Sequence, residues 1–115
     1  MSYMHVIIDM KKVGKESAVH HVETNLTNEN EVLEDFITPY LSDDRVIIDG
    51  SNLKASDIEK ISVFKSDKTA EELFAEEERK VAQSGIIGLF ARMPSAIRSK
   101  AENITREMFK KAQKT

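Results

Sequence analysis

The sequence contains no cysteine and no long apolar run. Without cysteine, the 115 residues cannot form a disulfide framework, a thiolate nucleophile or a cysteine-based zinc site. No segment approaches the roughly 20 apolar residues that a membrane-spanning helix needs. The first residues also lack the basic segment of a secretory signal, and they reach Asp9 early. We therefore expect a cytoplasmic protein that does not enter a membrane.

Recognisable motifs of catalysis and cofactor binding are missing as well. A stable zinc site needs three or four ligands, and the chain has only three histidines, of which His20 and His21 point to opposite faces of a strand. A hairpin would place His5 opposite His21, which supplies two ligands at most. The segment Gly85–Gly88 lacks the Lys-Ser/Thr pair and the preceding strand of a phosphate-binding loop. We expect no metal, no cofactor and no enzymatic activity.

Alternating apolar residues predict short strands in the first part of the chain. Residues 3–10 have the period of two that is typical of a half-buried strand, and residues 18–23 repeat it, which predicts an antiparallel hairpin. The run from Arg45 to Leu53 contains an Asp-Gly pair that favours a second hairpin. Residues 58–64 predict a last strand. Together these segments predict a small, mainly antiparallel sheet of four or five strands.

A helix is predicted between the two hairpins. Asn28 with Glu31 three residues on resembles a capping box, and apolar residues follow at helical spacing from Val32 to Tyr40. Pro39 disfavours helical geometry at Thr38, which predicts a kink or an end there. The fold class is therefore α+β, with residues 1–66 as the core covered by the 29–41 helix and residues 67–115 as a helical C-terminal arm of the same domain.

The C-terminal arm contains an apolar seam. Thr69 and Glu72 form a capping box that opens a charged helix reaching about Gln83. Helical structure is expected again from Ser95, where four apolar residues are spaced four, three and four apart: Ile97, Ala101, Ile104 and Met108. A helix with such a seam must bury it, either against its own sheet or against a partner or a second copy. A membrane-surface helix is a weaker alternative because bulky anchoring residues are lacking.

The charge of the chain is unevenly distributed. Residues 1–78 carry 18 acids and 8 bases, whereas residues 79–115 carry 9 bases and 2 acids. A basic arm can bind phosphates, and the candidates for such contacts are Arg98, Arg106, Lys110 and Lys111. Alternatively the arm docks on the acidic half of the chain or is a solvated helix face. Nucleic-acid binding is less favoured because residues 92–114 offer one aromatic residue, Phe109, for base stacking.

Several segments resemble a known family. They are Phe36-Ile-Thr-Pro-Tyr-Leu, Val46-Ile-Ile-Asp-Gly, Ser56-Asp-Ile-Glu-Lys-Ile-Ser-Val-Phe-Lys-Ser and Asn103-Ile-Thr-Arg-Glu-Met-Phe. Over about residues 30–109 the chain resembles the amino-terminal module of bacterial anti-phage defence proteins that carry a C-terminal, TIR-like predicted nucleotide-binding effector. The resemblance implies no catalytic residues, because the chemistry of those proteins belongs to the effector. It implies a non-enzymatic protein-recognition or regulatory module in phage–host conflict, or a phage-encoded inhibitor of a host defence protein.

Overall fold

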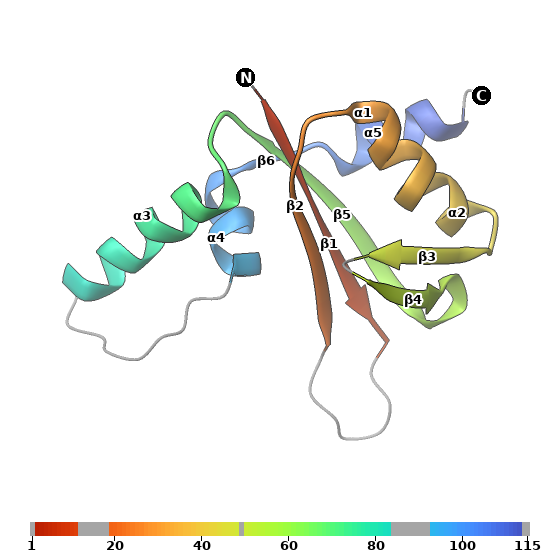
Figure 1. Ribbon diagram of the computed structural model, residues 1–115, viewed down its shortest axis with the longest axis horizontal. Coiled ribbons are helices and arrows are strands. Elements are labelled where there is room, and N and C mark those ends of the chain that lie inside the picture. The colour runs from red at the N-terminus through yellow and green to blue at the C-terminus, as the bar shows by residue number, and fades with distance from the viewer. Residues whose placement is uncertain (1, 12–18, 49, 84–92, 114–115) are drawn as a thin grey trace.

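The centre of the fold is a four-stranded antiparallel sheet with strand order β2-β1-β5-β6 (Figure 1). Its strands are β1 (Tyr3–Met10), β2 (His20–Leu26), β5 (Ile58–Ser66) and β6 (Glu102–Asn103). The long central pair keeps one register from Tyr3 to Asp9, with Val6 opposite Val63 and Ile8 opposite Ile61, and the register shifts at Met10. The predicted α+β class, the first hairpin and the last strand of the core are confirmed.

The computed structural model describes residues 2–11, 19–48, 50–83 and 93–113 of the chain. For residues 77–83 and 93–95 the description covers the backbone alone. The glycine segment Gly85–Gly88, which the sequence distinguishes from a phosphate-binding loop, lies outside the described residues.

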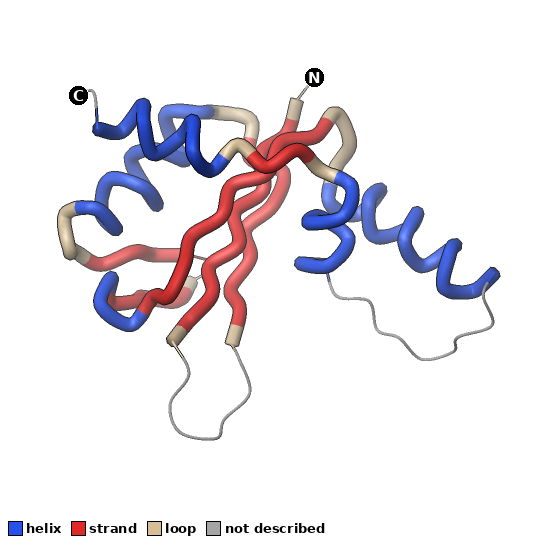
Figure 2. The backbone as a smooth tube through the Cα atoms, turned by 180° about the vertical axis from the view of Figure 1, so that it is seen from behind, coloured by secondary structure: helices blue, strands red, loops and turns tan. Residues whose placement is uncertain are grey.

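Helices lie on both sides of the sheet (Figure 2). On one side the helical segment α1 (Glu29–Val32), η1 (Leu33–Ile37) and α2 (Thr38–Leu41) packs with α5 (Thr105–Gln113). On the other side lie α3 (Ala70–Gln83) and α4 (Met93–Lys100), which pack against each other. The sheet is therefore a middle layer between two helical groups.

This arrangement corrects the prediction of a half-buried first strand. Met4, Val6 and Ile8 of β1 belong to the larger core beneath α1, η1 and α5. Ile7, on the opposite face, belongs to a second core that α3 and α4 complete. The strand is central and covered on both faces, so its alternation separates two cores instead of separating core from solvent.

The second hairpin is present but stands outside the main sheet. β3 (Arg45–Ile48) and β4 (Ser51–Lys54) pair only with each other, and Gly50 has the positive φ of 78° that the turn between them requires. A short 3-10 turn, η2 (Ala55–Asp57), leads from β4 into β5. Val46 and Ile48 face the larger core, whereas Ile47 is 61% exposed. The predicted single sheet of four or five strands is thus divided into two sheets.

The helix over the larger core continues past the predicted kink. Asn28 caps it, since its side-chain oxygen accepts a hydrogen bond from the Asn30 N–H at 2.9 Å. Thr38 keeps helical angles, and its N–H bonds to the Leu33 carbonyl across a π-helical turn. Pro39 has no N–H to donate, and the wider turn before it accommodates its ring without ending the helix. The helix does not end at Thr38 but reaches Leu41, which confirms the predicted 29–41 helix.

Candidate functional site

The apolar seam of the C-terminal arm is divided between the two cores. The segment that was predicted to be helical from Ser95 is divided between α4 and α5, because Glu102 and Asn103 leave helical geometry and pair with Lys65 and Phe64 of β5. Ile97 is buried in the core under α3 and α4, where Ala101 packs at its margin. Ile104 and Met108 are buried in the core on the other side of the sheet. These four side chains therefore pack within the chain, which corrects the interpretation that they form one partner-binding seam.

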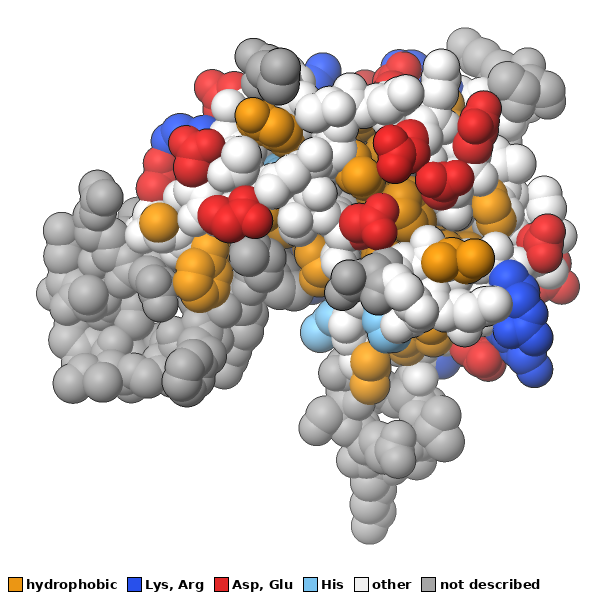
Figure 3. Space-filling view, viewed as in Figure 1, with side chains coloured by type: hydrophobic (Ala, Val, Ile, Leu, Met, Phe, Trp, Pro, Cys, Tyr) orange, Lys and Arg blue, Asp and Glu red, His pale blue; other side chains and the backbone are white. Residues whose placement is uncertain are grey.

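The basic residues of the arm fall into two groups. Nη2 of Arg98 donates to both carboxylate oxygens of Asp9 at 2.9 Å, and Lys111 forms an ion pair with Glu29. Lys100 lies 4.0 Å from Glu76. Part of the arm thus docks on the acidic half of the chain, as one of the sequence-based alternatives proposed. Figure 3 shows the acidic side chains that gather on the face of the molecule formed by α1 and α2.

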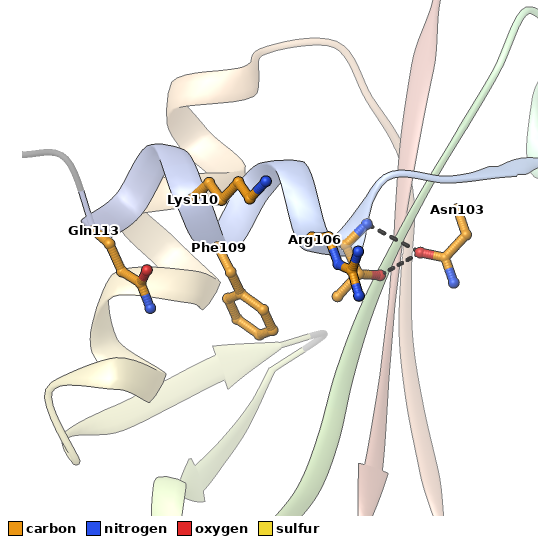
Figure 4. A pocket seen from close by; sticks show the side chains of 6 residues that line it. Asn103, Arg106, Phe109, Lys110 and Gln113 are labelled. Carbon is orange, nitrogen blue, oxygen red and sulfur yellow. Dashed lines mark hydrogen bonds between the residues drawn. The ribbon is translucent and has the colours of Figure 1, made fainter.

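The two remaining candidate phosphate contacts lie on one face of α5. Arg106 and Lys110 are exposed, one helical turn apart, and form no ion pair with any residue that the structure describes. They line an open hollow of about 580 Å³ together with Asn103, Thr105, Phe109 and Gln113 (Figure 4). The ring of Phe109 stacks on Tyr40 with centroids 6.2 Å apart. One of its faces is therefore already occupied, and base stacking in the hollow is restricted to the other.

The histidines do not form the pair that the sequence allowed. In the hairpin His21 lies opposite Ile8 and His20 opposite Asp9, so the expected pairing of His5 with His21 is wrong. A β-bulge in β2 shifts the register, and two residues, Thr24 and Asn25, stand opposite His5. Within the described ranges, no group of three or more His, Asp or Glu side chains is arranged to hold a metal ion.

His5 is fully buried in a polar network at the end of β2. The Asn25 N–H donates to its Nδ1 at 3.2 Å, so Nε2 carries the proton and donates to the Ser66 hydroxyl at 3.0 Å. Ser66 in turn donates to the Lys68 carbonyl at 2.5 Å. Burial lowers the pKa of His5, although a hydrogen bond to the Lys68 backbone and the charge of Glu71 oppose this shift. The imidazole is a donor toward Ser66 and cannot act as its general base, so the pair is structural.

Asn25 joins this network to the second helical layer. It adopts a left-handed backbone conformation with φ of 60° in the bulge. Its side-chain oxygen accepts the Ala70 N–H at 2.8 Å, and its amide donates to Glu71 at 2.8 Å. The predicted capping box at the same helix start is confirmed: the Glu72 N–H donates to Thr69 Oγ1 at 3.2 Å and the Thr69 N–H donates to Glu72 Oε1 at 3.1 Å. The start of α3 is thus held to the end of the sheet.

A second polar cluster lies at the other end of β1. Asp9 accepts a hydrogen bond of 2.5 Å from His20 Nδ1 in addition to the Arg98 contacts. Because a carboxylate only accepts, Nδ1 of His20 carries the proton in this contact. The cluster connects β1, β2 and α4. It holds the imidazole of His20 in a fixed orientation beside a carboxylate.

The outer edge of β2 is a free edge of the sheet. β2 has a strand on one side only, because it stands at the end of the order β2-β1-β5-β6. The Met10 N–H donates to the Val19 carbonyl at 3.0 Å, and hydrogen-bonded pairs alternate with non-bonded ones in an antiparallel ladder. Ile8–His21 and Val6–Glu23 are accordingly bonded pairs. The backbone N–H and C=O groups of His20 and Val22 therefore point away from β1.

These outward groups are the functional candidates that reading the sequence missed. The part of the chain that the structure describes offers no hydrogen-bond partner to them. A signal was present, since residues 19–26 contain one charged residue, Glu23, in a chain with 32% charged residues. Edge strands are usually protected by lysine or proline, and this segment has neither. Strand order, however, could not be inferred from that composition.

No helix among the described residues is long and apolar enough to cross a membrane. Comparisons of the chain with models of protein families, with curated proteins and with solved structures gave no match.

Proposed function

We propose that the chain is a non-enzymatic recognition module that binds an extended segment of a protein at the edge of β2. The observation that carries this proposal is the unpartnered row of backbone groups on His20 and Val22. An extended peptide can add a strand to such an edge, and its main-chain hydrogen bonds then provide affinity. Side chains that alternate along the added strand provide specificity.

The surroundings of the edge support strand addition. The edge is in regular register with β1 from His20 to Glu23, and the bulge follows at Thr24 and Asn25. β1, to which β2 is paired, is buried on both faces and gives the edge a rigid support. The Asp9 contact holds the His20 side chain beside the edge. A partner strand would thus meet a preformed template and would not have to order it.

Replacing Val22 with proline should weaken peptide binding about tenfold while the chain stays folded. The substitution removes an N–H that points away from β1, a position where edge strands tolerate proline, and the ring also obstructs an added strand. Peptides selected from a random library against the parent chain would be titrated against Val22→Pro and against Val22→Ala. The alanine variant keeps the N–H and removes similar packing, so it should bind within about twofold of the parent. Equal binding of all three chains would contradict the proposal.

The setting that we propose is phage–host conflict, and the resemblance of residues 30–109 to anti-phage defence modules supports it. The alternative is a phage-encoded inhibitor of a host defence protein. Efficiency of plating distinguishes the two roles when the chain is expressed in bacteria. A defence role lowers plating, whereas an inhibitor raises it in a host that carries the matching defence system. In either case Val22→Pro should lose the effect and Val22→Ala should keep it.

A second candidate function is binding of a single-stranded nucleic acid along α5. The specific observation in its favour is the hollow lined by Arg106 and Lys110, the two candidate phosphate contacts that form no ion pair with another described residue. The excess of acids in residues 1–78 opposes it.

If α5 binds a single strand, the double variant Arg106→Ala/Lys110→Ala should lower affinity and flatten its dependence on salt. Each lost phosphate contact reduces the slope of log K against log salt by about 0.7 for single strands, so the slope should fall by about 1.4. Fluorescence anisotropy with a labelled oligonucleotide between about 50 and 200 mM salt measures it. Lys111→Ala is the matched control, because Glu29 already engages that ammonium group. A slope that the double variant leaves unchanged would eliminate this candidate.

A further inference from the structure

The part of the β2 edge that could pair with another strand is short and has an odd number of residues, so one residue lies at its centre. It begins at His20, where the strand begins, and ends at Thr24, before the left-handed Asn25. Val22 is the midpoint of these five residues. Outward backbone groups lie on His20 and Val22, and Thr24 follows them at the start of the bulge. A segment of this kind can pair with a copy of itself about a twofold axis through Val22.

Pairing about Val22 places complementary side chains opposite each other. Val22 meets Val22 of the second copy, and His20 meets the second copy's Thr24. On the other face of the sheet His21 meets the second copy's Glu23, and the symmetry repeats this contact. Opposite charges and hydrogen-bonding partners at directly opposed positions stabilise a strand pair. A carboxylate accepts several hydrogen bonds, so Glu23 can make this contact in addition to any that it makes within its own chain.

Other registers for pairing two β2 strands place less favourable side chains opposite each other. A twofold axis through His21 would set the two His21 side chains against each other and Glu23 against the apolar Val19. An axis through Glu23 would oppose two carboxylates, which destabilises a strand pair. Val22 is therefore the centre that uses the whole segment and opposes no like charges.

We propose that the partner at this edge is a second copy of the chain, paired antiparallel through residues 20–24. This inference rests on the proposed function, since it names the partner of the same edge. The contact is isologous, with each copy offering the same residues, and it closes at two copies. It joins two four-stranded sheets into one continuous sheet and leaves no free β2 edge. A five-residue interface makes this a reversible dimer whose population depends on concentration.

Sedimentation equilibrium over chain concentrations from about 1 μM to 1 mM tests the proposal, a range that covers weak to moderate affinities. The parent chain should shift from the 13.0 kDa mass of one chain toward twice that mass. Val22→Pro should stay a monomer, and Val22→Ala should associate nearly as the parent does. Thermal melting of each variant verifies that it is folded.

Charge exchange supplies an independent test that leaves the backbone intact. His21→Glu opposes two pairs of carboxylates across the interface and should weaken association about tenfold. Glu23→Lys removes both favourable contacts and should also weaken it. The double variant His21→Glu/Glu23→Lys restores opposite charges at both places and should recover dimerisation to within about threefold.

The outcomes separate this inference from the proposed function. A parent chain that remains monomeric up to about 1 mM overturns self-pairing, and so does a dimer that Val22→Pro and the charge variants leave unchanged. If library-selected peptides still bind in a manner that Val22→Pro abolishes, edge recognition stands and only the identity of the partner fails. If neither association nor peptide binding depends on Val22→Pro, both proposals fail.

Discussion

Replacing Ile104 with aspartate is expected to destabilise the fold by about 4 kcal/mol or more, enough to unfold much of the population at 37 °C. Ile104 is 6% exposed and lies in the larger core with Met108 and Val63. Its N–H donates to the Val63 carbonyl at 2.9 Å, which fixes the side chain at the junction of β6 and α5. The substitution removes apolar packing and also forces a carboxylate into an apolar site, where ionisation is costly.

Chemical unfolding monitored by circular dichroism measures this effect. Ile47→Asp is the matched control, because the same substitution at a 61% exposed isoleucine should change stability by about 0.5 kcal/mol or less. Ile104→Val should cost about 1 kcal/mol, as the loss of one buried methylene group typically does. A chain carrying Ile104→Asp that unfolds at the parent's midpoint would contradict the burial of this residue. It would also revive the interpretation that the residue serves a partner.

Acidification is expected to destabilise the chain through His5. Burial lowers the pKa of His5 below its ordinary value, so the unfolded chain takes up a proton at a higher pH than the folded chain does. The contribution of His5 to stability is therefore complete above about pH 6.5, and it is lost as the pH falls from there toward the lowered pKa. In that pH range the free energy of unfolding should fall by at most about 1.4 kcal/mol per pH unit, the limit for the uptake of one proton. Protonation would set an N–H on Nδ1 against the Asn25 N–H, which explains the cost physically.

Comparison with His5→Leu isolates this effect from the other histidines. The leucine variant leaves the Asn25 N–H and the Ser66 hydroxyl without the imidazole, so it should be less stable than the parent near neutral pH by about 1–3 kcal/mol. The gap between the two chains should narrow as the pH is lowered from about 7.5 to 5, because only the parent loses the His5 contribution. His20 and His21 are present in both chains, so their contributions cancel in the difference. Parallel stability profiles over this range would show that His5 is not protected from protonation.

The apolar seam that contains Ile104 was only partly predictable from the sequence. The spacing of Ile97, Ala101, Ile104 and Met108 fits one helix, yet Asn103 interrupts it. Its side-chain oxygen accepts the Thr105 N–H at 3.0 Å and thereby starts a new helix. The seam was thus identified as buried apolar surface, but its two halves face different cores. Periodicity identifies which residues are hidden and cannot state what covers them.

The sequence by itself determined the local elements of this protein. Alternation specified β1 and β5, Asn28 and the Thr69–Glu72 box specified two helix starts, and the Asp-Gly pair specified the second hairpin. Each of these signals acts within a few residues, through backbone hydrogen bonds and side-chain caps that need no distant partner.

Only the tertiary structure decided how the elements are combined. Pairing of Glu102 with Lys65 splits the C-terminal arm, and helices on both sides of the sheet bury His5 and Ile7 on one face of β1 and Val6 on the other. Exclusion of β3 and β4 from the main sheet, together with the order β2-β1-β5-β6, leaves the outer edge of β2 open. Contacts between residues far apart in the chain set these features, because many pairings satisfy the same local pattern and the choice among them depends on how all the apolar faces are buried at once.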